Sequence, residues 1–380
     1  MTSKDPPKRD PAIDFVRGVA ILIILIDHIE IVTGQKWISD YTLHALGPTD
    51  ALAVFVFVSG YVCGRVYGNV LRSKGIGACL KKALLRITQL YMWQVALYAF
   101  AAFAIAWPIS QKEEFLQFMK LGEAIAEPIR ATVLALQLQY HPIFFDILPL
   151  YMVLLLLLPA MLFLIQKDPI IAVLASTLVY SNTQLWPTFN IPLEVANLRG
   201  EFQWLLNPFS WQILFFVALL PSNGVSFAWL VDTAYSKFVS LGIFVILTMI
   251  LQSELLLDSH QLRSLADKST LGIIRLVYSL SLAYLLASWW NALVRVATSP
   301  LLRPIAICGR YSLSVFCIGI MMTLSCAALF TCQYLNSTGV KLFELFAVAA
   351  SMISAYFFSL RVPKTHRMNA VGQLSSTTRQ

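Results

Sequence analysis

The chain is a succession of apolar segments, each about long enough to cross a lipid bilayer, separated by short polar connections. A helix needs about 20 apolar residues to span the hydrocarbon core, and on this criterion we expect about ten transmembrane helices. The sequence therefore predicts an all-α, polytopic membrane helix bundle. The predicted spans lie near 12–32, 49–67, 84–107, 146–166, 169–187, 208–222, 236–257, 271–294, 305–333 and 340–361.

The composition argues against a soluble protein. Hydrophobic residues make up 58% of the chain and charged residues 13%, and the mean hydropathy is +0.71. A soluble domain would have to expose large apolar patches, whereas a bundle in a bilayer can turn them toward lipid. The net charge of +8 does not indicate nucleic-acid binding, because the basic residues lie between the apolar segments. The six cysteines form no CxxC pair, so we expect neither a disulfide framework nor a metal site.

Positive charge predicts the orientation of the chain in the membrane. If the N-terminus is cytoplasmic, most of the 28 Lys and Arg residues fall in cytoplasmic segments, and the acidic residues lean to the outer side. An even number of spans returns the C-terminus to the cytoplasm. We therefore expect a cytoplasmic tail at 1–11, a transmembrane domain at 12–361 and a second cytoplasmic tail at 362–380.

His28 is the candidate for chemistry in the first predicted helix. At about 100° per residue it lies on the same helix face as Arg17, about three turns farther toward the outer side. Ionisable residues at such depth usually face a bundle interior or a wet cavity. His28 could bridge two helices by hydrogen bonds. Alternatively, a neutral imidazole could act as a general base near pH 7, with a carboxylate fixing its tautomer.

Polar residues at the outer ends of other predicted helices converge on the level of His28. Asp50 opens the second span and Asp146 the fourth, so either could be a helix N-cap or a partner of the imidazole. Further candidates precede the sixth span or lie near its start. They are Arg199, Glu201, Trp204, Asn207 and Trp211.

The inner side offers two ambiguous features. Gly60, Gly64 and Gly68 recur at four-residue spacing, which either lets helices pack closely or leaves room for a thin ligand chain. The basic residues Arg65, Arg86 and Arg310 either set topology or contact a phosphorylated donor.

Five sequence blocks together resemble the OpgC family, within the acyltransferase-3-type membrane acyltransferases. The blocks are RDPAIDFVRGVAILIILIDHIE, TDALAVFVFVSGYVCGRVYG, FFDILPLYMVLLLLLP, NPFSWQILF and GRYSLSVFCIG, in this order. The resemblance covers about residue 9 to residue 361. It implies an O-succinyltransferase of the bacterial inner membrane, with cytosolic succinyl-CoA as donor and osmoregulated periplasmic glucans as acceptors.

The resemblance also suggests roles for individual residues. The family's histidine late in the first helix falls on His28, and its polar residues at two outer helix ends fall on Asp50 and Asp146. The donor would contact Arg65, Arg86 and Arg310, and no permanently bound cofactor or metal is expected. The glucan would contact the residues around the sixth span named above. Alternatively, the Trp residues there belong to the aromatic belt that membrane proteins form at the membrane–water interface. A transporter or flippase for a glucan or lipid-linked sugar is the alternative function, and homo-oligomerisation is left open.

Overall fold

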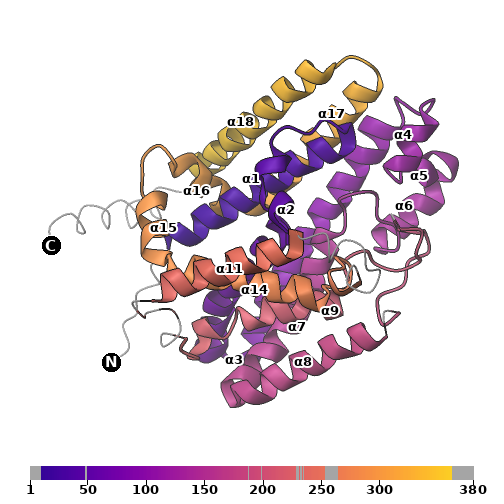
Figure 1. The fold of residues 1–380 in the computed structure, drawn as a ribbon. Helices are drawn as coiled ribbons and strands as arrows, with labels where there is room; N and C mark the ends of the chain where they lie inside the picture. The colour runs from indigo at the N-terminus through magenta and orange to yellow at the C-terminus, as the bar shows by residue number, and fades with distance from the viewer. Residues whose placement is uncertain are drawn as a thin grey trace.

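The computed structural model describes residues 10–361 except 48, 187, 198, 228–230, 232, 234 and 253–263. These residues form a helical bundle (Figure 1), and their one β feature is an isolated bridge between Pro192 and Gln203. The predicted all-α class is therefore confirmed. The predicted tails lie almost entirely outside the described residues.

The long helices follow the apolar segments of the sequence. Their bounds are α1 Pro11–Thr33, α3 Ala51–Ala99, α7 Ile147–Lys167, α8 Pro169–Leu185, α9 Pro208–Val217, α11 Ser236–Gln252, α14 Ile273–Ser288, α17 Ser312–Thr331 and α18 Ser337–Arg361. Shorter elements connect them. They are η1 Ser39–Tyr41, α2 Leu43–Leu46, η2 Phe100–Ala106, α4 Glu113–Phe118, α5 Gly122–Ala126, α6 Pro128–Leu136, η3 Pro221–Asn223, α15 Trp290–Ala297 and α16 Arg303–Arg310.

The helix α3 reverses direction at Gly75. This glycine has φ 77° and ψ 177°, a conformation outside the helical region that residues with a side chain rarely adopt. The ammonium of Lys82 lies 5.3 Å from the ring centroid of Tyr67. A straight helix would separate these residues by about 22 Å along its axis, so the two halves must fold back on each other. The halves correspond to the predicted second and third spans.

Two predicted spans are broken. The eighth consists of α14 and α15, which are bent by 70° at Trp289. The ninth consists of α16 and α17, which are separated by the non-helical Tyr311. Hydropathy does not detect such breaks, because the residues on both sides are apolar. The sixth predicted span contains α9, which has only 10 residues.

Within the described part of the chain, four helices are long and apolar enough to cross a membrane, or five if the bent pair α14–α15 forms one span. The helix α1 has 23 residues but carries four charged residues, namely Asp14, Arg17, Asp27 and Glu30. The protein is thus a membrane protein with several apolar helices. The number of ten spans and the cytoplasmic placement of both termini stay predictions.

The helix α1 is packed at the centre of one half of the molecule, against α3, α16 and α17. Its contact with α16 depends on two glycines: a Cβ on Gly18 would lie 1.9 Å from the carbonyl oxygen of Ile305, and one on Gly309 would lie 1.8 Å from that of Asp14.

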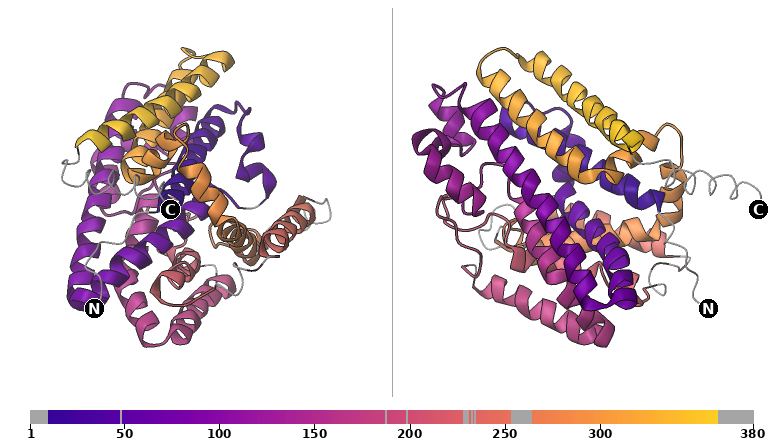
Figure 2. Two further views of the ribbon diagram at one scale, coloured as in Figure 1. Left: turned by 90° about the vertical axis from the view of Figure 1, so that its left-hand side faces the viewer. Right: turned by 180° about the vertical axis from the view of Figure 1, so that it is seen from behind.

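The end of α18 approaches the helices α1 and α16, because Ala355 packs with Ile21 and Cys308. The start of α1 and the end of α18 therefore lie on the same side (Figure 2).

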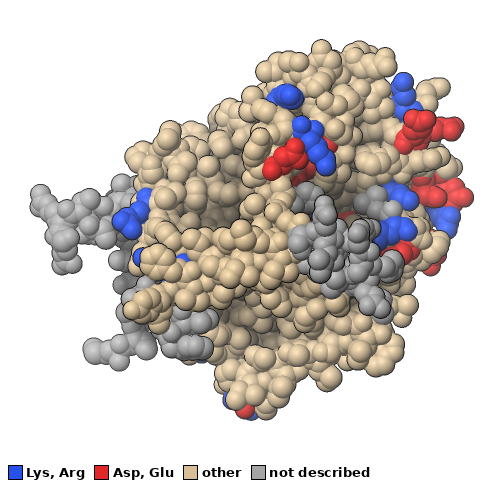
Figure 3. All heavy atoms as spheres, in the orientation of Figure 1, with Lys and Arg blue, Asp and Glu red and all other residues tan. Residues whose placement is uncertain are grey.

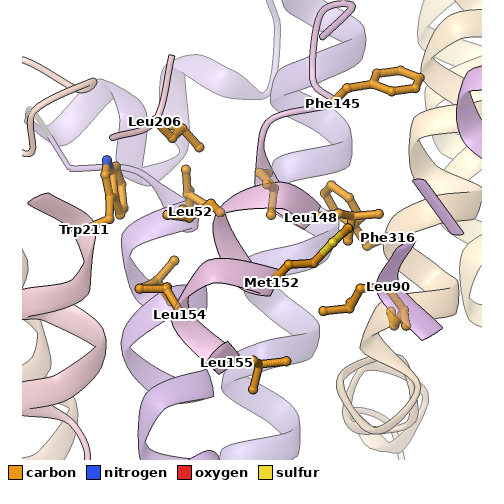
Figure 4. Close-up of a cluster of buried hydrophobic side chains, with 14 of the residues drawn as sticks. Leu52, Leu90, Phe145, Leu148, Met152, Leu154, Leu155, Leu206, Trp211 and Phe316 are labelled. Carbon is orange, nitrogen blue, oxygen red and sulfur yellow. The ribbon is translucent and has the colours of Figure 1, made fainter. Parts of the chain in front are cut away.

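The predicted glycine face of the second span is filled by protein. A Cβ on Gly60 would lie 2.2 Å from the carbonyl oxygen of Phe215, and Gly64 and Gly68 meet Ser222 and Asn223 equally closely. The packing interpretation of these glycines is therefore confirmed, and they do not form the wall of a ligand channel. A cluster of buried side chains from α3, α7, α9 and α17 forms the adjacent core (Figure 4).

Charged side chains are sparse on the face shown in Figure 3, and those visible lie in two groups, one at the left and lower edges and one from the upper centre to the right side. The right side carries the acidic groups of the connection between α3 and α7, which folds into the short helices α4, α5 and α6. A broad band without charges separates the two sides, as expected for a protein embedded in a bilayer.

Candidate functional site

His28 lies near the end of α1, at the level where several other helices begin. Its ring stacks on the ring of Phe144, with the centroids 3.8 Å apart and the planes inclined by 20°. Its Nδ1 atom is buried and has no hydrogen-bond partner among the described residues. Lys268 and Asp50 are the charged groups close enough to interact electrostatically with the ring. His28 thus has a free buried nitrogen next to a charge pair.

Asp50 caps α3 and also holds two cations. Its Oδ1 accepts a hydrogen bond from the backbone amide of Ala53 at 3.2 Å. Its Oδ2 lies 2.6 Å from Nζ of Lys268 and 3.7 Å from a guanidinium nitrogen of Arg275. The capping interpretation of Asp50 is therefore confirmed, but the same carboxylate also forms an ion-pair cluster. Asp50 makes no hydrogen bond to His28 in the described structure.

Asp146 pairs with a different histidine. Its Oδ1 lies 3.2 Å from Nδ1 of His141, and both residues are buried. Asp146 is the N-cap residue of α7, as the capping interpretation expected, but its side chain makes no capping hydrogen bond. The connection from His141 to Asp146 also contains Phe144, so one short loop carries His141 and contacts His28.

Arg199 is held by the loop that precedes α14. A guanidinium nitrogen of Arg199 lies 2.6 Å from Asp267 and donates to Ser269 at 3.3 Å. Burial alone would raise the pKa of Asp267, but hydrogen bonds from Ser269, Thr270 and Arg199, with the charge of Arg199, outweigh it and lower the pKa to about 2. Lys268 lies in this same loop, so the Arg199 pair also fixes the cation that faces Asp50.

The other predicted sugar contacts differ in their exposure. Trp204 is 5% exposed and lies against His141, with ring centroids 5.2 Å apart. Trp211 lies in the core beside Leu52 (Figure 4) and its indole donates to the Lys268 carbonyl at 3.0 Å, so neither ring face is open to a sugar.

Asn207 is fully buried and caps α9, because its side-chain oxygen accepts a hydrogen bond from the backbone amide of Phe209 at 3.0 Å. Glu201 accepts from Gln203 at 3.3 Å.

A second polar cluster lies deeper toward the other end of the bundle. Arg17 donates to the hydroxyl of Ser312 at 2.6 Å, and its Nε is buried without a partner in the described structure. Arg17 and Arg86 line one small cavity of about 20 Å³ together with Tyr151 and Ser312. Two guanidinium groups facing a small buried space favour an anionic group there.

The three predicted donor contacts are not equivalent. Arg86 is half-buried and points into the bundle, Arg65 is half-buried on the first half of α3, and Arg310 is exposed and stacks on Tyr311 at 5.7 Å. The structure therefore brings Arg86 together with Arg17, which was not among the predicted donor contacts.

Sequence reasoning missed His141, Lys268 and Phe144 as parts of the site. His141 precedes a proline in a loop, which gives no helix to position it, although the motif HPIFFD places an aspartate five residues after it. Lys268 gave no signal, because a lysine in an outer loop is ordinary. His260 and His366 lie outside the described residues. Among the described residues, no group of three or more His, Cys, Asp or Glu side chains could hold a metal ion.

The comparisons with known proteins decide the family. A family profile described as OpgC protein matches residues 9–361. The chain belongs to the OpgC family. Membership of the OpgC family indicates a glucan-modifying acyltransferase, which agrees with the apolar helices and with the histidine site. No curated protein and no solved structure matches the chain.

Proposed function

We propose that this OpgC protein is an O-succinyltransferase of the bacterial inner membrane, which transfers succinyl groups from cytosolic succinyl-CoA to hydroxyls of periplasmic glucans. The observation that carries the proposal is the buried, unpartnered Nδ1 of His28, on a histidine held by Phe144 in a family of glucan-modifying enzymes. A buried polar atom without a partner is unusual in a folded protein and calls for an explanation.

In the proposed reaction, a nitrogen of His28 removes the proton from a glucan hydroxyl as its oxygen attacks the thioester carbonyl carbon. A C–O ester bond forms and the C–S bond breaks. Coenzyme A leaves as a thiol after it takes the proton from the imidazolium. The charge pair of Asp50 and Lys268 stabilises the changes of charge at the ring, because both groups interact with it electrostatically.

The two clusters suit a donor and an acceptor that meet inside the bundle. Arg17 and Arg86 offer cations for the anionic donor, and the cluster around His28 lies at the end where the loops of α7, α9 and α14 meet. An anionic nucleotide is costly to bury without such partners. This division gives each substrate its own side of the membrane.

The test uses the purified protein in lipid nanodiscs with labelled succinyl-CoA and unsubstituted glucan. We expect label in the glucan, and we expect His28→Ala to lower the rate by about 10²–10⁴-fold, the usual contribution of a positioned base. His366→Ala, beyond the residues that match the family profile, is the matched control and should retain the wild-type rate. In sealed proteoliposomes of the same protein, glucan that crosses the membrane unmodified, with no label incorporated, would instead favour a transporter.

A further inference from the structure

We propose that His141 and Trp204 form a subsite that binds one hydroxyl group of the acceptor glucan, and that Asp146 is the residue that positions His141. This inference rests on the proposed function. It differs from the sequence-based expectation that Asp146 is a catalytic partner of His28.

The first observation is that the histidine has a defined tautomer. An ionised carboxylate can only accept hydrogen bonds, so the contact of 3.2 Å between Asp146 and Nδ1 of His141 requires the proton on Nδ1. When the imidazole is neutral, Nε2 therefore carries a lone pair and is a hydrogen-bond acceptor. Asp146 thus determines the side of the ring that can receive a proton.

The second observation is that two polar atoms remain unsatisfied at the same place. Nε2 of His141 and Nε1 of Trp204 are both buried and lack a partner among the described residues. The two residues are 6% and 5% exposed, and their ring centroids are 5.2 Å apart. Buried polar atoms without a hydrogen bond are rare in folded proteins, so two of them on neighbouring rings point to a polar group that binds here.

The chemistry of the two atoms matches a hydroxyl group. The indole nitrogen can only donate, and Nε2 can accept. A hydroxyl oxygen can accept from the indole while its proton is donated to the imidazole. Because both nitrogens are buried, only a small group can reach them, and the exocyclic CH₂OH group of a hexose is the part of the sugar that we assign to this subsite.

The position in the fold connects this subsite to the proposed reaction. His141 and Asp146 flank Phe144, the residue that stacks on His28. Phe144 has φ 69°, which is uncommon for a bulky side chain and indicates that the surrounding structure holds the loop in place. A hydroxyl bound at His141 would anchor the acceptor beside the loop that contacts His28.

The experiment measures binding of an unsubstituted glucan oligosaccharide to the full-length protein in nanodiscs without donor. Trp204→Phe removes the indole donor and keeps an aromatic ring, and Asp146→Asn removes the obligate acceptor. Each should weaken oligosaccharide binding and raise the acceptor KM by about 3–10-fold, the worth of one net hydrogen bond. The donor KM should stay constant, and Asp146→Glu should recover part of the binding. Trp107→Phe, at an indole that is 62% exposed, is the matched control.

Three outcomes would overturn the subsite. The first is unchanged oligosaccharide binding in Trp204→Phe and Asp146→Asn at wild-type abundance. The second is an equal rise of both Michaelis constants with a lowered Tm, which would show a purely structural role. The third is a wild-type protein that binds no oligosaccharide. Failure of the proposed function is a separate result, because it would be seen as absent succinyl transfer in a wild-type protein whose oligosaccharide binding still responds to these variants.

Discussion

The ring of His28 stacks on the ring of Phe144, with their centroids 3.8 Å apart. The contact joins the end of α1 to the loop that precedes α7, and that loop bends through Phe144 at a positive φ of 69°. The stack restricts the rotation of the imidazole, because the ring of Phe144 covers one of its faces. Phe144 therefore positions the proposed base, although it carries no group that could take part in proton transfer.

Replacing Phe144 by Leu should lower kcat while leaving the protein folded. A stacked aromatic pair contributes about 0.5–1.5 kcal/mol beyond its buried area, which corresponds to a rate loss of about 2–12-fold. Steady-state kinetics with both substrates would show the change in kcat, and Phe343→Leu, in a ring pair with Phe346 on α18, would serve as a control. A Phe144→Leu protein with the wild-type kcat would show that the stack is unimportant for the reaction.

Replacing Asp50 by Asn should keep its role as a helix cap and remove its ion pairs. Asn caps helices as well as Asp does, so α3 should still begin at the same residue. The ion pairs with Lys268 and Arg275 are lost, and the free energy of unfolding should fall by about 1–3 kcal/mol. Thermal unfolding in detergent measures the change. The double variant with Lys268→Met should lose less than the sum of the single variants, whereas strict additivity would contradict a direct pair.

Replacing Arg86 or Arg17 by Gln should weaken donor binding. Each removes a cation from the cavity that also contains Tyr151 and Ser312, so the KM for succinyl-CoA should rise by about 10–100-fold, the worth of a hydrogen bond to a charged group. The acceptor KM should change much less. Arg295→Gln, on the exposed surface of α15, should leave both constants unchanged. Equal effects of Arg86→Gln on both substrates would argue against a donor site in this cavity.

Single-cysteine labels after Ser3 and near Thr377 should both react only from the cytoplasmic side. This prediction rests on the excess of Lys and Arg in the segments that this orientation places in the cytoplasm. A label at Lys112→Cys, an exposed position between η2 and α4, should react with an impermeant reagent in cells whose outer membrane is permeabilised. Reaction of the Thr377 label under these conditions would overturn the topology.

The pair of Asp267 and Arg199 should make stability depend on acidity. The pKa of Asp267 is lowered to about 2 in the folded protein, so its stabilisation is complete above the unfolded pKa and is lost as the pH falls toward 2. The wild type should therefore unfold at a higher Tm than Asp267→Asn at pH 6, and the difference should shrink below about pH 4. A difference that stays constant across this range would contradict the pair as its cause.

The sequence alone determined the class of the protein and the level at which its polar residues meet. A long apolar run in a bilayer must satisfy its backbone hydrogen bonds internally, and a helix does so within one segment. The helices therefore follow from hydropathy, and their approximate bounds follow from the polar connections. The same pattern placed Asp50, Asp146 and Trp204 at the level of His28, because the start of one helix and the end of the preceding one lie on the same side of a membrane.

The tertiary structure decided which of these residues are partners. Asp50 pairs with Lys268 and Asp146 with His141, and neither carboxylate makes a hydrogen bond to His28 in the described structure. Such pairs depend on the rotation of each helix and the path of each loop, which are set by packing between distant segments. The glycine contacts between α1 and α16 and the reversal at Gly75 are examples. Hydropathy reports the depth of a residue along a helix, but only the packed bundle determines the neighbours of its side chain.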